Sequence, residues 1–454
     1  MKNIVIIGAG LSGLSTAYYL HKKGHKVTIL EKENRVGGKI ASFKKEGFIY
    51  ESGPNTGVLN NIEIVNLFEE LGEECPLVTA NEEAKFRLIW KGNSFHALPN
   101  SMIKAITTPL FSFKDKMRIT FEPFRKKGTE ENESIASFVR RRMGNSFLKY
   151  AVDPFVSGVY AGDPEKIVVK YALPKLYNLE QDYGSLVGGA IKKASAKKDA
   201  DSKKITKDVF TCEGGLEMLV TALVNRIGKE NIVTSATDIV VSKGDKWCVN
   251  YSKNGITSSI NCDAVISTAT AFSLPEMFPF IEKKNMDKIN ILPYSNIIQI
   301  IVGVKDVKGN NPMAFGGLIP SCEKKDILGI LYPSCCFNRR APKEGMLYAF
   351  FMGGSRRPDL FEWSNKKIEE YVREQFKTML NMPDDIKPSF IEIYKHENAI
   401  PQYQEDCKAR FEAINIIENK YKGIFLAGNI RDGVGMSDRV KQGKNISNLP
   451  FWEK

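Results

Sequence analysis

A glycine-rich turn close to the N-terminus constrains this 454-residue chain more than any other feature. The apolar run of residues 4–7, Ile-Val-Ile-Ile, predicts a parallel strand buried on both faces. It leads into the pattern GxGxxG, made by Gly8, Gly10 and Gly13, and helical periodicity follows over residues 14–23. A strand, a glycine turn and a helix in this order predict a dinucleotide site, because the first N–H groups of the helix face the phosphates.

An acidic residue and a second glycine pair follow this turn. Residues 26–30 predict a second strand that ends at Glu31, about 20 residues after the glycines, where a carboxylate can accept hydrogen bonds from ribose hydroxyls. Residues 35–39, Arg-Val-Gly-Gly-Lys, resemble the RxGG segment of flavoproteins with a two-dinucleotide-binding domain, among them amine oxidases and carotenoid desaturases. This resemblance implies that the ligand is FAD and that the Gly37-Gly38 backbone passes close to it.

Two further turns extend the predicted cofactor site. The turn at residues 53–56 can bring backbone amides to a ring or a phosphate, although a plain turn is an equal alternative in isolation. Near the C-terminus an apolar segment ends in a glycine turn and a last helix follows, whose positive end suits a flavin ring. The residues predicted to bind FAD are Gly8, Ala9, Gly10, Leu11, Ser12, Gly13, Glu31, Lys32, Arg35, Gly37, Gly38, Lys39, Gly53, Pro54, Asn55, Thr56, Gly428, Val434, Gly435 and Met436.

Composition limits the class of protein and its partners. The chain is 43% hydrophobic and 26% charged, as in globular domains, and its net charge of +12 favours an anionic partner. We expect no nucleic-acid partner, because no nucleic-acid motif accompanies the charge, which leaves an acidic membrane surface or an acidic small molecule. No run approaches the roughly 20 apolar residues of a membrane span.

Cysteine and histidine usage argues against disulfide and metal chemistry. The eight cysteines are scattered without CxxC spacing, and the chain has four histidines. We therefore expect reduced thiols, no metal site and a cytoplasmic protein, with peripheral contact with the cytoplasmic membrane as an option.

The predicted fold class is α/β (α+β) in three parts. A discontinuous Rossmann-like FAD-binding domain comprises residues 1–75, 206–289 and 415–454, and a mixed-sheet substrate domain comprises residues 76–100 and 290–414. Strand patterns at residues 231–233, 239–241, 247–251 and 263–268 are expected to join the N-terminal strands.

Residues 101–205 are expected to form a helical, membrane-associating subdomain. Phenylalanines alternate there with lysines and arginines, which fits an amphipathic interfacial surface. An ordinary helical subdomain with solvated basic faces is an equally open interpretation. The polar run at residues 190–204 predicts a mobile loop.

Several motifs together resemble the protoporphyrinogen and coproporphyrinogen oxidases of haem biosynthesis. They are Gly53-Pro54-Asn55, the segment 153–164 (DPFVSGVYAGDP), the segment 214–219 (GGLEML) and the segment 337–342 (FNRRAP). The resemblance implies oxidation of a porphyrinogen to a porphyrin, with FAD taking electrons in three two-electron steps. Oxygen or another acceptor would reoxidise the flavin.

The same resemblance implies roles for individual residues. Arg87 stands where the family pairs an arginine with a substrate propionate, and Leu318 and Leu331 match leucines that enclose one ring. Phe351 matches a bulky residue that stacks on another ring, and Ala236 falls where main-chain atoms hold the cofactor. Arg439 departs from the family, which has a cysteine at that position. No residue is a convincing general base.

Several alternatives stay open from the sequence. The chain could be another flavin oxidoreductase of this fold, an amine oxidase or a carotenoid desaturase, or a flavin- and tetrapyrrole-binding partner without turnover. Arg87 could instead be a surface residue paired with a nearby glutamate. The number of substrate propionates, the electron acceptor and a homodimeric state are likewise left open.

Overall fold

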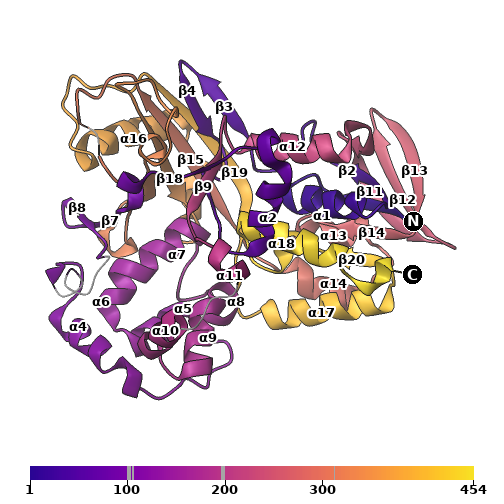
Figure 1. The fold of residues 1–454 in the computed structure, drawn as a ribbon, viewed down its shortest axis with the longest axis horizontal. Helices are drawn as coiled ribbons and strands as arrows, with labels where there is room; N and C mark the ends of the chain where they lie inside the picture. Colours follow the sequence, from indigo (N-terminus) through magenta and orange to yellow (C-terminus); the bar gives the residue numbers. More distant parts are fainter. Residues whose placement is uncertain (100–103, 105–106, 196–199, 311, 454) are drawn as a thin grey trace.

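The computed structural model describes residues 1–99, 104, 107–195, 200–310 and 312–453. A parallel sheet and a mixed sheet follow each other along the long axis of the molecule, and a helical region lies beside the mixed sheet (Figure 1). Both chain ends lie at the end of the molecule that holds the parallel sheet. In the described part of the chain, no helix combines the length and the apolar character needed to cross a membrane.

The parallel sheet gathers strands from distant parts of the sequence. Its order is β10 (Ile232–Val233), β2 (Lys26–Leu30), β1 (Asn3–Ile7), β14 (Ala264–Ser267) and β20 (Ile424–Leu426). Alternate residues of β1 enter two different cores, since Ile4 and Ile6 pack in one cluster and Val5 and Ile7 in the other. This arrangement confirms the prediction that the first strand is buried on both faces.

Helices cover both faces of the parallel sheet. One face packs against α1 (Leu11–Lys22), α12 (Glu217–Ile227) and α18 (Met436–Ser447). The other face packs against α14 (Lys283–Asn290) and α17 (Cys407–Lys420). The helix after the glycine turn begins at Leu11, three residues before the predicted start, so Gly13 lies inside the helix and not in the turn.

Two of the strands expected in the parallel sheet lie elsewhere. β11 (Thr237–Lys243), β12 (Trp247–Lys253) and β13 (Ile256–Cys262) form a separate antiparallel sheet. Short turns join these strands, and neighbouring strands joined by tight turns pair antiparallel, whereas a parallel pair needs a long crossover. The prediction that residues 239–241 and 247–251 join the N-terminal strands was therefore wrong.

The mixed sheet has seven strands. Its order is β19 (Phe390–Pro401), β15 (Tyr294–Val304), β18 (Met346–Gly353), β17 (Ile327–Leu331), β16 (Gly316–Leu318), β7 (Arg87–Lys91) and β8 (Ser94–Ala97). One face packs against α16 (Asn365–Met379). The opposite face packs against the hairpin of β3 (Ser42–Lys45) and β4 (Phe48–Glu51) through Phe48 and Tyr50.

The helical region has its own core. Its helices are α4 (Phe113–Thr120), α5 (Ile135–Arg142), α6 (Asn145–Phe147), α7 (Asp153–Tyr160), α8 (Val169–Ala172), α9 (Pro174–Tyr183), α10 (Leu186–Ser195) and α11 (Ala200–Lys204). Arg142 and Glu122 are fully buried there, and 2.9 Å separates their charged atoms. Burial of a charge is costly unless it is paired, so this ion pair and the further bonds of Glu122 to Ser185 and Leu186 hold the helices in one arrangement.

The predicted loop at residues 190–204 is helical where it is described. α10 extends to Ser195 and α11 begins at Ala200, while residues 196–199 lie outside the described residues. The lysines there extend from helix faces, and lysine has a good helix propensity, so low hydrophobicity alone did not exclude a helix.

The remaining elements connect these parts. They are β5 (Gly57–Val58), β6 (Leu77–Thr79) and β9 (Val209–Cys212), which form a small sheet, together with α2 (Ile62–Leu71), α13 (Leu274–Met277) and α15 (Pro333–Cys336). All eight cysteines are free thiols, and the Sγ atoms of Cys75 and Cys212 lie 3.3 Å apart.

Candidate functional site

Of the three glycines in the GxGxxG pattern, the first and third are tightly packed and the second is open. Gly8 has a φ of +101°, and a Cβ atom on Gly13 would lie 1.9 Å from the carbonyl oxygen of Gly8. A Cβ atom on Gly10 would have no neighbour within 4 Å. The first and third glycines therefore allow the turn and the close contact of α1 with it, and Gly10 leaves backbone free for a ligand to approach.

The N-terminus of α1 provides hydrogen-bond donors and positive potential at this opening. Gly10 is the N-cap residue, and Leu11, Ser12 and Gly13 form the first turn, whose N–H groups have no partner within the helix. No acidic side chain occupies that turn. The helix dipole adds a partial positive charge there, so this end of α1 suits a phosphate group.

Glu31 is fixed directly beneath the turn. Its side chain is 6% exposed, and its carboxylate accepts the N–H of Ala9 at 2.7 Å and the N–H of Glu33 at 2.9 Å. The N–H of Ala236 donates to the backbone oxygen of Glu31 at 2.8 Å, so Ala236 lies at the same strand end. Lys32 is exposed and pairs only with Glu33 among the described residues.

The second glycine pair lies against the first turn. Gly37 donates its N–H to Ala9 and forms a parallel bridge with Gly10, and a Cβ atom on Gly38 would lie 3.2 Å from Cα of Gly10. Arg35 donates to three carbonyl oxygens of its own loop, those of Val36, Gly38 and Ile40. Arg35 thus shapes the loop that carries the glycines.

The turn at residues 53–56 meets this loop. A Cβ atom on Gly53 would lie 1.9 Å from the carbonyl oxygen of Lys39, and Asn55 donates its side-chain N–H to Gly53 at 3.2 Å. Pro54 and Thr56 flank Asn55 and are half-buried. Partial desolvation of the Lys39 side chain, together with the nearby charge of Lys32, lowers its pKa.

The C-terminal turn reaches the same place from β20. Gly428 has a φ of +81°, and its Cβ position lies 2.8 Å from the backbone oxygen of Thr268, whose hydroxyl donates to Ile7 and Gly8. Val434 and Gly435 precede α18, and Met436 is its first residue. α18 packs directly on α1, because a Cβ atom on Gly443 would lie 2.7 Å from the backbone nitrogen of Thr16.

Arg439 has a structural role that the sequence did not reveal. Its side chain is 7% exposed, and its guanidinium donates to the backbone oxygens of Gly428, Arg431, Asp432 and Gly433. Burial lowers its pKa, which the neighbouring Tyr403 and Asp438 partly offset. Arg439 therefore holds the C-terminal turn from within, where the family cysteine could form at most weak hydrogen bonds.

Strand register gathers the four predicted substrate residues on one face of the mixed sheet. Arg87 lies opposite Gly316, which lies opposite Leu331, and Leu318 lies opposite Gly329, which lies opposite Phe351. Residues in register, and residues two apart on one strand, project from the same face. We call this the Arg87 face; it is the face that also packs against the β3–β4 hairpin, not the one covered by α16.

Arg87 brings a charge to that face without an ion pair. Its side chain is exposed, and its guanidinium lies 5.5 Å from the ring centre of Phe315. In the described part of the chain no carboxylate forms an ion pair with Arg87, contrary to the alternative that it pairs with a nearby glutamate. Leu318, Leu331 and Phe351 are each half-buried, as expected of walls that a ligand would cover.

A buried ion pair between the β3–β4 hairpin and the loop after α15 was missed by sequence reasoning. Glu51 and Arg340 are 3% and 5% exposed, and their charged atoms lie 3.1 Å apart. The Glu51 carboxylate also accepts the Ser42 hydroxyl and the N–H of Leu216, and burial raises its pKa despite these bonds. The pair joins the segments 51–56, 214–219 and 337–342, so the presence of these three motifs in one chain was the available signal.

His396 lies beside this junction. Its Nε2 atom lies 2.5 Å from the carbonyl oxygen of Ser52, to which it can donate, and burial lowers its pKa. The neutral ring therefore positions the backbone next to Gly53. Within the described residues no cluster of histidine, cysteine or carboxylate side chains is arranged to hold a metal ion.

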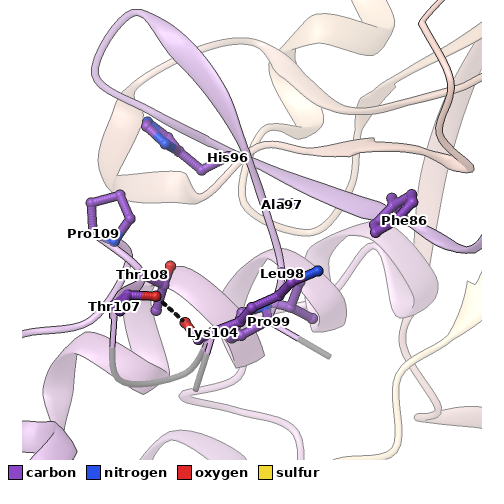
Figure 2. Close-up of a pocket in the computed structure, with 9 residues that line it drawn as sticks. All are labelled: Phe86, His96, Ala97, Leu98, Pro99, Lys104, Thr107, Thr108 and Pro109. Carbon is purple, nitrogen blue, oxygen red and sulfur yellow. Dashed lines mark hydrogen bonds between the residues drawn. The ribbon is translucent and has the colours of Figure 1, made fainter. Parts of the chain in front are cut away.

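One surface pocket lies apart from the glycine turns. It has a volume of about 240 Å³ and lies between the β7–β8 hairpin and the residues Lys104, Thr107, Thr108 and Pro109, with Phe86 and His96 in its wall (Figure 2). This volume is below the roughly 300–1,000 Å³ of small-molecule sites, and we give the pocket no role in the chemistry.

The arrangement fits FAD. Four glycine turns converge where Gly10 is open, a helix N-terminus offers donors, and a buried carboxylate is fixed beside them. Together they define a dinucleotide-binding protein whose site has the features that FAD requires.

Comparison with known proteins places the chain in a family. Residues 11–448 match the model described as flavin containing amine oxidoreductase, and the chain belongs to this family. FAD is accordingly its cofactor, and the protein is a flavin-containing oxidoreductase.

Individual relatives narrow the comparison. The chain is 30% identical to protoporphyrinogen oxidase 2 of Arabidopsis thaliana, with 99% of this chain and 93% of the relative covered. It is 26% identical to coproporphyrinogen III oxidase of Bacillus subtilis, with 98% and 96% covered. The crystal structure of a putative protoporphyrinogen oxidase from Exiguobacterium sp. 255-15 matches with a TM-score of 0.82 at 20% identity, and the match covers 100% of this chain and 99% of that one. The structure of cyclohexylamine oxidase from Brevibacterium oxydans IH-35A matches with a TM-score of 0.71 at 12% identity, and the match covers 100% of this chain and 99% of that one. These two structures support the fold alone.

Substitution of Glu31 tests the cofactor site. Glu31→Ala removes the acceptor for two backbone N–H groups and for the predicted ribose hydroxyls, at a cost of roughly 1–3 kcal/mol, or about 5- to 150-fold in the Kd for FAD. Titration of the apoprotein with FAD, followed by flavin fluorescence, measures this change. Glu33→Ala, at an exposed neighbour, is the control and should bind FAD as the parent does. An unchanged Kd for Glu31→Ala would contradict the assigned site.

Proposed function

We propose that this flavin-containing oxidoreductase oxidises a porphyrinogen, protoporphyrinogen IX or coproporphyrinogen III, to the porphyrin. The observation that carries the proposal is the Arg87 face, where Arg87, which forms no ion pair with any described residue, shares one side of the sheet with three half-buried apolar side chains. A porphyrinogen is a large apolar ring system with anionic propionates, so it needs apolar walls and a fixed cation. Relatives with both named activities align over nearly the whole chain.

We further propose the division of labour between the parts of the chain. Residues 1–75, 206–289 and 415–454 bind FAD, and residues 76–100 and 290–414 bind substrate. Residues 101–205 form the helical subdomain. The parallel sheet and the mixed sheet support this division, since each draws its strands from the corresponding ranges.

The residues of the chain contribute positioning and not acid–base chemistry. FAD, when bound, supplies the two-electron acceptor for each of the three oxidation steps. The backbone around Gly10 and Gly38, with Glu31, holds the cofactor, and Arg87 holds a propionate. Leu318, Leu331 and Phe351 orient the rings and exclude water, and correct orientation accounts for much of the acceleration in such reactions. We assign no general base.

Anaerobic mixing of the FAD-loaded protein with each of four substrates tests this function and distinguishes it from the alternatives. The flavin should lose its yellow colour with protoporphyrinogen IX or coproporphyrinogen III, and the faster of the two identifies the preferred substrate. A primary amine and a carotene are the comparison substrates for an amine oxidase and a desaturase. Bleaching by either of these alone, or by none of the four, would overturn the proposal.

Arg87→Ala should weaken substrate binding. Loss of a charge-assisted pair worth about 1.5–3 kcal/mol raises the KM for porphyrinogen roughly ten- to a hundredfold. Flavin content and thermal stability should match the parent, because Arg87 has no ion pair to lose within the described chain. Arg87→Lys should restore part of the loss, since an ammonium cannot form the bidentate fork.

The control for this series is Lys85→Ala. Lys85 is exposed two residues earlier and pairs with Glu82, so its removal should leave the kinetics unchanged. Steady-state assays that follow porphyrin fluorescence measure the KM and kcat of all three variants. Parental kinetics for Arg87→Ala would refute the role of Arg87.

We propose that the helical subdomain contacts anionic membranes. Phe113, Met117, Phe121 and Phe124 follow helical spacing on α4 and the turn after it, with exposed fractions of 78%, 43%, 57% and 85%. Cationic side chains lie among them in the sequence, at Lys114, Arg118, Arg125, Lys126 and Lys127. Apolar side chains with cations around them are the pattern of interfacial helices.

Vesicle sedimentation tests this surface. The parent should bind phosphatidylglycerol vesicles and lose binding as salt rises, because surface charges are screened over roughly 10 Å at 0.1 M. The double variant Phe113→Ser/Phe124→Ser should bind several-fold less, whereas Ile256→Ser, at an exposed position on β13, should bind as the parent. Equal binding to neutral vesicles would exclude the electrostatic part, and equal binding by the double variant would exclude the surface.

A further inference from the structure

The segment 153–164 has a carboxylate near each end, Asp153 and Asp163, that the proposed chemistry does not use. α7 (Asp153–Tyr160) occupies most of the segment, with Asp153 at its first position and Asp163 just beyond its end. Asp153 is 4% exposed, and its carboxylate accepts the N–H and the hydroxyl of Ser321 at 2.8 and 3.1 Å. Ser321 follows β16, the strand that carries Leu318, so the start of α7 is attached to that strand.

Arg356 joins both carboxylates to a second strand. Its two terminal nitrogens lie 2.5 Å from an oxygen of Asp153 and 3.0 Å from an oxygen of Asp163. Arg356 stands three residues after the end of β18, the strand that carries Phe351. One guanidinium thus links both ends of α7 to the loop behind Phe351.

The backbone of that loop is shaped for the same contact. Gly353 and Gly354 have φ values of +94° and +80°, which favour glycine. A Cβ atom on Gly354 would lie 2.8 Å from the carbonyl oxygen of Ala161, and that oxygen accepts the N–H of Ser355 at 2.8 Å. The turn at Gly353 and Gly354 therefore contacts the end of α7 directly, and the Arg356 side chain extends along that helix.

α7 itself contacts a predicted wall of the substrate site. A Cβ atom on Gly158 would lie 2.5 Å from Cδ2 of Leu318, so the helix lies against that side chain without space for a larger residue. A shift of α7 would move Leu318 or release it. Leu318 and Phe351 lie in one row across the sheet with Gly329 between them, so the position of α7 affects the space between these two side chains.

We propose that Arg356 is a positioning residue that holds α7 against the loops after β16 and β18. It thereby fixes the space between Leu318 and Phe351 on the Arg87 face. The kinetic part of this inference rests on the proposed function. The electrostatics suit a clamp: burial works against the charge of Arg356, but Asp153 and Asp163 outweigh it and raise its pKa. A planar fork can address two carboxylates at once, which a lysine cannot do.

The test compares Arg356→Gln with Arg357→Gln in the FAD-loaded protein. Arg357 is the next residue, is more exposed, and pairs with Asp326 and Asp359 and not with α7. Hydrogen exchange without substrate should be roughly tenfold faster over residues 153–164 in Arg356→Gln than in the parent, and unchanged in Arg357→Gln. Asp163→Asn, which keeps the Asp153 contact, should give a smaller increase and guards against a variant that fails to fold.

Kinetics then separate positioning from general destabilisation. Arg356→Gln should raise the KM for porphyrinogen roughly tenfold with kcat and the flavin spectrum close to the parent, and Arg356→Lys should recover part of the loss. Parental exchange over residues 153–164, or a parental KM despite faster exchange, would overturn the proposal. If the parent bleaches with no porphyrinogen, the proposed function fails, and the exchange result alone decides whether Arg356 clamps α7.

Discussion

The contact of α1 with the glycine turn is the constraint on which the rest of the molecule depends. A Cβ atom on Gly13 would overlap the backbone oxygen of Gly8, so α1 can begin directly after the turn only with glycine there. Two further contacts without side chains extend this packing, Gly443 against Thr16 and Gly428 against Thr268. They bring the ends of β1, β14 and β20 to one edge, and the loops proposed to bind FAD meet there because parallel strands end on the same side.

Charge pairs with little exposure to solvent connect the different parts of the molecule. Glu51 and Arg340 join the β3–β4 hairpin to the loop after α15, and the side chain of Gln299 in the mixed sheet donates to the backbone of Glu51. Asp153 and Arg356 join the helical region to the mixed sheet. Removal of one partner of such a pair leaves an uncompensated charge in a poorly solvated place, so each pair specifies one relative placement of the segments it joins.

Local patterns predicted the elements well and distant pairings poorly. The apolar run, the glycines and the helical period lie within about one helix length of each other, so β1, α1 and β2 follow from propensity and spacing. The separate sheet of β11, β12 and β13 was not predicted, because the sequence of a short strand does not show which other strand it pairs with. Arg340 and Glu51 are 289 positions apart, and a charged residue gives no sign in the sequence that it will be buried. The sequence showed Arg439 only as a departure from the family cysteine, and its hydrogen bonds to the backbone of the C-terminal turn could not be predicted.

The partners of the buried arginines distinguish structural charges from the charge of Arg87. Arg142, Arg340 and Arg356 each face carboxylates in buried or half-buried places, and the terminal nitrogens of Arg439 donate to backbone oxygens, so these charges stabilise the fold. Arg87 differs, because in the described chain it contacts an aromatic ring and no carboxylate, on a sheet face whose apolar side chains remain half-exposed. A cation in such a place gains more from an anionic ligand than from water, since a charge-assisted bond strengthens as a ligand displaces solvent. The contrast between paired and unpaired arginines, more than any single motif, indicates which charge is available to a substrate.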